Sequence, residues 1–251
     1  MFLFSCGIED YIYLDPIPAS NVSHTSGNTL VQVTIPPTPA VYFTHYVIFY
    51  RIYVSEVPLT SEITDLGTVS TVNNSTLTSN YNTLRPYADE TNTISASQVG
   101  TVFNNLLYSE LAVSGGNLQT LLGPSGTSRS LAIDFSDSAA YDIPYLTING
   151  GLPYQLRRTW TVRGFSPPSG APSAFTPLPS GTGYDFTRSQ DLCYVNSINN
   201  WDISVKSGTD WGSGTGQYAY VSLYIAARGI DGNFNSIYSR PTFLGVLRLP
   251  D

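Results

Sequence analysis

The chain has 251 residues, of which 41% are hydrophobic and only 12% are charged, with a formal net charge of -7 and 18 tyrosines. Disordered chains combine low hydrophobicity with high charge, so this composition excludes disorder and supplies enough apolar area for a buried core. The single lysine, Lys206, and the ten arginines are spread along the sequence, which argues against a nucleic-acid partner. Uncharged polar residues must cover most of the surface, which favours short strands and turns over surface helices.

The N-terminal segment is the part of the sequence that indicates a cellular location. Leu3-Phe4-Ser5-Cys6 resembles a relaxed lipobox, the site at which exported bacterial lipoproteins are cut before a cysteine that carries lipid. A signal peptide has a basic region and about 7–15 apolar residues, whereas five residues precede Cys6. This interpretation therefore requires that the start of the sequence is misassigned or trimmed. The alternative is a partly apolar N-terminus with a free thiol at Cys6.

Residues 1–27 are expected to form a lipid-anchor and tether segment. The segment contains Pro16 and Pro18 and is rich in turn-forming residues up to Gly27. No run of about 18 apolar residues occurs in the chain, so attachment to a membrane would be through lipid. A diacyl unit on the Cys6 thiol plus one amide-linked chain would meet the two-chain requirement for stable anchoring. We expect an exported protein of the bacterial cell envelope, at the outer membrane or cell surface.

Three segments have the alternation of long strands. Thr29–Ile35 alternates and stops at Pro36-Pro37, and Val41–Val54 is apolar on both faces. Apolar residues on both faces predict a central strand that is covered on each side. Tyr218–Arg228 is the third strand, Asp231-Gly232-Asn233 predicts a hairpin turn after it, and the chain is expected to return over Ile237–Leu249.

The middle of the chain is predicted to be mixed. Ser95–Tyr108 has helical spacing, with Ser95 as a plausible N-cap and Gln98 three residues later. Asn149-Gly150-Gly151 predicts a turn between two strands. The strands expected in this part are Leu131–Phe135, Tyr145–Ile148 and Gln155–Arg163. We expect residues 28–251 to form a single mainly β domain, in which an insertion at about 57–215 packs on the same sandwich.

The strand outline resembles a fibronectin type III-like (Ig-like) antiparallel sandwich. Leu30–Pro37 looks like its second strand, Tyr46–Tyr53 like its third, and Tyr220–Ala227 with the turn after it like its last hairpin. That family has only a few tens of residues between the third strand and the last hairpin, where this chain has about 160. The lipobox and tether, together with the closing Arg240–Pro250, also resemble uncharacterised spirochaete-type lipoproteins, a family that implies no mechanism.

Residues for catalysis are scarce. A nucleophile–histidine–carboxylate triad would have to use His24 or His45, and neither accompanies a Gly-x-Ser-x-Gly elbow. Cys193 lies in an alternating run and is interpreted as a buried structural cysteine. The aspartates from Asp134 to Asp142 could supply the carboxylate pair of a glycoside hydrolase, but their Ser and Gly neighbours favour solvated turns. We expect no enzyme, no cofactor and no metal site.

Trp201 and Trp211 are the candidate ligand contacts. Both lie in turn-like surroundings beside Asn and Asp. An exposed Trp there would stack on a sugar ring while its polar neighbours bond the hydroxyls. The alternative is that both rings close loops at the rim of the sandwich.

The function predicted from these features is that of a cell-envelope lipoprotein acting as a non-enzymatic binding or structural module. Its partners would be the membrane, through the N-terminal lipid, and a protein or glycan ligand. One alternative is a carbohydrate-binding or carbohydrate-active protein. Another is a virion or appendage structural β-protein, which shares the composition rich in Ser, Thr, Gly and Tyr and predicts symmetric assembly without lipid.

Overall fold

The computed structural model describes residues 14–24, 29–38, 41–55, 93–95, 109–136, 144–158, 184–186, 203–205 and 218–249. Strands β1 to β4 cover Val22–His24, Leu30–Ile35, Phe43–Ser55 and Thr93–Ser95, and β5 to β8 cover Ser109–Val113, Arg129–Asp134, Tyr145–Ile148 and Tyr154–Arg158. Strands β9 to β13 cover Tyr184–Asp185, Ile203–Val205, Tyr218–Ile230, Ser236–Ser239 and Thr242–Arg248. A 3-10 turn, η1 at Ala19–Asn21, and a short helix, α3 at Leu118–Leu121, are also described.

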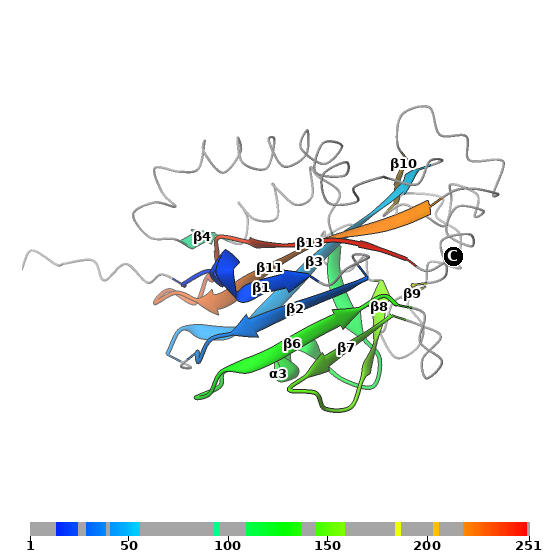
Figure 1. Cartoon of the computed structure of the whole chain (residues 1–251). Helices are drawn as coiled ribbons and strands as arrows, with labels where there is room; N and C mark the ends of the chain where they lie inside the picture. Colours follow the sequence, from blue (N-terminus) through cyan, green and yellow to red (C-terminus); the bar gives the residue numbers. More distant parts are fainter. Residues whose placement is uncertain are drawn as a thin grey trace, which may run out of the picture.

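The described strands form one sheet that is mainly antiparallel. Its neighbours run β1-β2-β6-β7-β8-β5-β3-β11-β12-β4, while β13 also pairs with β11, β10 with β3 and β9 with β8. The pair β10–β3 is parallel. Strand β13 contacts β1 and β2, so the sheet curls until its margins nearly meet (Figure 1). One hydrophobic core fills the inside of this nearly closed sheet.

Strand β3 occupies the centre, as its sequence predicts. Ile48, Tyr50 and Ile52 belong to the core, and Val47 and Phe49 are buried on the opposite face. Strand β11 pairs along its length, and β5 pairs with part of its other edge. A strand with two covered faces must be apolar on both, which explains why β3 lacks the polar alternation of an outer strand.

Two hairpin predictions are confirmed. Strands β11 and β12 are antiparallel and joined through the Asp-Gly-Asn turn. Between β7 and β8, Asn149 and Gly150 have φ values of 53° and 65°, and the Gly151 N–H donates to the Ile148 carbonyl at 2.9 Å. Two successive positive φ values are the signature of the tight turn whose twist matches the strands, and Asn-Gly is the pair that adopts it most readily.

Some of the predicted boundaries differ from the observed ones. The return over Ile237–Leu249 is two strands, β12 and β13, because the chain breaks at Arg240-Pro241. Proline has no N–H to donate to a strand pair. Ser95, the predicted N-cap of a helix, is the last residue of β4, and residues 96–108 lie outside the described part of the chain. The short helix α3 was not predicted.

The N-terminal segment Leu14–His24 lies against the sheet. Leu14 and Ile17 are buried, and β1 pairs with β2. The Thr242 hydroxyl of β13 donates to the Ile17 carbonyl at 2.5 Å. The segment therefore bridges the two margins of the sheet.

Gly245 makes this bridge possible. Its φ of +128° lies in a region that favours glycine, and a Cβ at this position would overlap the His24 ring. The close approach of β1 to β13 thus depends on a residue without a side chain.

We predict that Gly245→Ala lowers the free energy of unfolding by about 1–3 kcal/mol, because the new methyl group must displace His24 and the backbone is strained. Urea denaturation followed by circular dichroism measures the change. The matched control is Gly126→Ala, where a Cβ meets nothing within 4 Å and a change below about 0.5 kcal/mol is expected. Equal denaturation midpoints for the two variants would contradict the role given to Gly245.

Candidate functional site

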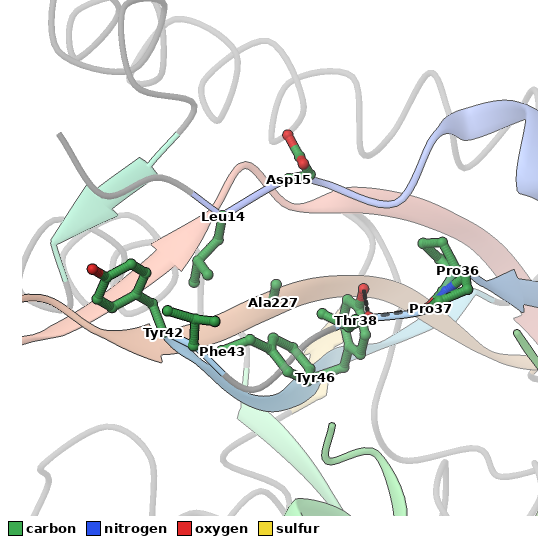
Figure 2. Close-up of a pocket in the computed structure, with 10 residues that line it drawn as sticks. Leu14, Asp15, Pro36, Pro37, Thr38, Tyr42, Phe43, Tyr46 and Ala227 are labelled. Carbon is green, nitrogen blue, oxygen red and sulfur yellow. Dashed lines mark hydrogen bonds between the residues drawn. The ribbon is translucent and has the colours of Figure 1, made fainter. Parts of the chain in front are cut away.

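A hollow of about 270 Å³ lies at the end of the sheet where β3 begins and β11 ends (Figure 2). Four separate segments build it: the start of the N-terminal segment, the chain after β2, the start of β3, and β11. The lining residues are Leu14, Asp15, Pro36, Pro37, Thr38, Val41, Tyr42, Phe43, Tyr46 and Ala227. Most of this wall is apolar, and the Phe43 and Tyr46 rings pack at a centroid distance of 4.8 Å.

The wall is held by contacts between the start of β3 and the end of β11. The Ile230 N–H donates to the Tyr42 carbonyl at 2.9 Å, and the Thr44 hydroxyl donates to the Arg228 carbonyl at 2.9 Å. A Cβ on Gly229 would overlap the Tyr42 carbonyl oxygen and approach Leu14 to 3.0 Å. Glycine is therefore required where β11 passes the edge of the hollow.

The Thr38 and Tyr46 hydroxyls of the wall have hydrogen-bond partners within it. The Thr38 hydroxyl donates to the Pro36 carbonyl at 3.0 Å and lies 3.2 Å from the Tyr46 hydroxyl. Because the Thr38 proton is used, the Tyr46 hydroxyl donates to the Thr38 oxygen. Burial raises the pKa of Tyr46, so its phenol stays protonated. Figure 2 shows the Asp15 carboxylate directed away from the rings. The hollow consequently offers an occupant mainly apolar surface.

Exposed apolar side chains surround this end of the molecule. Val41 is 73% exposed, Tyr42 44%, Ile230 39% and Phe234 89%. We call these four residues the end cluster. The fifth large hydrophobic residue exposed in the described part of the chain is Leu152, which lies in the turn between β7 and β8. An apolar group of this kind beside a hollow is typical of a contact surface.

The turn after β11 holds Phe234 in place. The Asp231 carboxylate accepts hydrogen bonds from the backbone N–H groups of Asn233 at 2.9 Å and Asn235 at 2.7 Å, and from the Asn235 side chain at 3.1 Å. These bonds lower the pKa of Asp231, which keeps it ionised. The Asp231 carboxylate therefore fixes the backbone of this turn.

A second group of ionisable side chains lies on the face of β3 opposite the core. Arg228 stands 5.6 Å from the Tyr238 ring centroid and donates to the Ser236 hydroxyl at 3.4 Å. Burial raises the pKa of Tyr238 to about 12 and raises that of Glu110, whereas the Arg228 charge counteracts both. Arg228 thus links β11 to β12 and stabilises buried polar groups on this face.

The two histidines occupy structural positions. His24 packs against Gly245, and His45 is 7% exposed opposite Arg228 in the β3–β11 register. Burial and then the Arg228 charge lower the pKa of His45 to about 4. In the described ranges, no group of three or more His, Cys, Asp or Glu side chains could hold a metal ion.

The predicted lipidation cysteine, the two candidate ligand-contact tryptophans and the second cysteine are not placed. Cys6, Trp201, Trp211 and Cys193 all lie outside the described residues. Sequence reasoning also missed the hollow and Phe234. The signal for Phe234 is an aromatic residue inside Asp-Gly-Asn-Phe-Asn, a turn that needs no aromatic side chain.

No protein-family model, curated protein or solved structure matches this chain. In the described part, no helix is long and apolar enough to cross a membrane.

We predict that acid destabilises the fold partly through His45. Its pKa is 6.5 in an ordinary setting and about 4 in the folded chain. The unfolded state therefore binds more protons between these values, and the free energy of unfolding falls as the pH drops from about 6.5 to about 4. Burial also lowers the pKa of His24, so it contributes in the same direction.

Replacing His45 by glutamine removes its part of this dependence. Denaturation of the parent and of His45→Gln at several pH values should show a smaller loss of stability in the variant over that interval. Parallel curves would exclude the shifted His45 pKa as a cause.

Proposed function

We propose that this chain is a lipid-anchored module of the bacterial cell envelope that binds a protein partner through the end cluster and hollow, without chemistry of its own. The observation that carries the proposal is the gathering of four of the five large exposed apolar side chains of the described part at one end. Exposed apolar groups of this kind cost solubility and are typical of contact surfaces.

A protein partner fits this end better than a glycan. Sugar sites present free hydrogen-bonding groups to ring hydroxyls, whereas the Thr38 and Tyr46 hydroxyls are used within the wall. Tyr42 and Phe234 supply the aromatic area that dominates protein contacts.

The proposal includes a fibronectin type III-like sandwich as the scaffold. Such folds place the first, second and fifth strands side by side in one sheet, and the third, sixth and seventh in the other. The neighbours β1-β2-β6 and β3-β11-β13 have these adjacencies. This chain departs from the pattern through β7, β8 and β5, which connect the two groups into one continuous sheet.

The anchor would lie close to the contact surface. Leu14 lines the hollow, and Cys6 precedes it by only a short stretch. Fully extended, such a stretch spans no more than about 30 Å. A module anchored at Cys6 therefore presents the hollow near the membrane, where its partner would be another envelope protein.

Metabolic labelling tests the anchor. With the gene's own upstream region included, a bacterial host fed an alkyne analogue of palmitate is expected to label the protein. Cys6→Ser should abolish the label, because the thiol is the lipid acceptor, whereas Cys193→Ser should leave it unchanged. Label that is absent, or that persists in Cys6→Ser, would refute lipid attachment at Cys6.

A further inference from the structure

The hollow and the exposed ring of Phe234 lie at the same end of the molecule and have matching chemistry. We propose that the hollow of one copy receives the Phe234 side chain of a second copy, so that two chains form a two-fold symmetric dimer. This inference names the partner for the proposed contact surface and rests on that part of the proposed function, but it does not depend on the lipid.

Phe234 has the properties of a side chain built for an external contact. It is 89% exposed, so the folded single chain gains almost nothing from burying it. Its φ of 65° is left-handed, a conformation that a bulky side chain adopts only at a cost. Glycine or asparagine would occupy the position without strain. A strained aromatic residue at the tip of a turn is explained if its ring packs against another molecule.

The turn presents this ring in a fixed position. The Asp231 carboxylate binds Asn233 and Asn235, and the Phe234 N–H donates to the Asp231 carbonyl at 3.0 Å. Because these bonds order the backbone before any encounter, little conformational entropy is lost on binding.

The hollow suits an aromatic ring. An apolar cavity of about 150 Å³ binds benzene, and the hollow measures about 270 Å³. Leu14, Phe43 and Tyr46 provide apolar and aromatic walls. Since the Thr38 and Tyr46 hydroxyls already have partners within the wall, a phenyl ring would leave neither of them unsatisfied.

Two-fold symmetry follows from the position of the two parts. The hydrogen bond from Ile230 to Tyr42 joins the strand that leads to the Phe234 turn directly to the rim of the hollow. When a projection and a receptor lie at the same end of a molecule, two copies can exchange them reciprocally, which gives a closed dimer instead of an open fibre. Val41, Tyr42 and Ile230 would then surround both rings and exclude water from them.

Sedimentation velocity of the full chain tests the dimer. The unlipidated protein, kept in reducing buffer, is measured from about 1 to about 100 µM, the range in which a small apolar interface associates. We expect a monomer–dimer equilibrium. Phe234→Gly should weaken association by at least about tenfold, because both rings are lost from the symmetric interface.

Two controls separate this effect from general changes. Leu152→Ser removes a side chain that is 83% exposed at a different turn, and it should leave association unchanged. Phe234→Gly should raise the midpoint of urea denaturation or leave it unchanged, because glycine relieves the positive φ. Lost association with intact folding would then be due to the ring.

Salt gives an independent readout. Each copy carries a net charge of -7, so raising the salt from about 0.05 to about 0.5 M should strengthen an apolar dimer by screening the repulsion.

Four outcomes would overturn the inference. They are a parent chain that stays monomeric, a Phe234→Gly variant that associates as well as the parent, a Leu152→Ser variant that loses association equally, and a dimer that dissociates in salt. None of them affects Cys6 labelling, so the dimer and the anchor can fail separately.

Discussion

The pairing of β3 with β11 is the interaction on which the rest of the structure depends. Their register runs from Tyr218 opposite Ser55 to Gly229 opposite Phe43. Burial on both faces makes this pair the interior of the sheet, with β5 beside β3 and β12 and β13 beside β11. Where the pair ends, Gly229 brings the backbones of the two strands into contact. The hollow lies beside that point, and the turn that carries Phe234 follows it in the chain.

Much of this framework could be predicted from the sequence. The segments that became β2 and β11 have the alternation of strands, and the segment that became β3 is a long run that is apolar on both faces. Asp-Gly and Asn-Gly are strong turn signals. The helix α3 could not be predicted because its four residues are too few to show helical periodicity. Its N-cap is a recognisable signal, since the Asn117 side chain accepts a hydrogen bond from the Gln119 N–H. The break at Pro241 was visible in the sequence, but both flanking segments are apolar and were read as one strand.

The candidate site was harder to predict because its residues come from four segments. Leu14, Thr38 and Ala227 are distant in sequence, and each is unremarkable in its own segment. Only the fold brings them together. Phe234 differs from these residues because its unusual feature lies within its own segment: an aromatic residue occupies a turn position with positive φ. The sequence predicts a hairpin turn in that segment, and this interpretation leaves the Phe234 ring unexplained.

The bridge between the first and last strands has a consequence for how the chain folds. The hydrogen bond from Thr242 to Ile17 joins residues 225 positions apart. Strand β3 cannot pair with β11 until β11, which comes late in the sequence, has been synthesised. Contacts of such long sequence separation form slowly, because loop closure costs entropy before any contact compensates for it. During synthesis, the apolar faces of β3 would remain uncovered until almost the whole chain is available. Folding intermediates of this protein are therefore expected to be long-lived, and to need protection from aggregation until the C-terminal strands arrive.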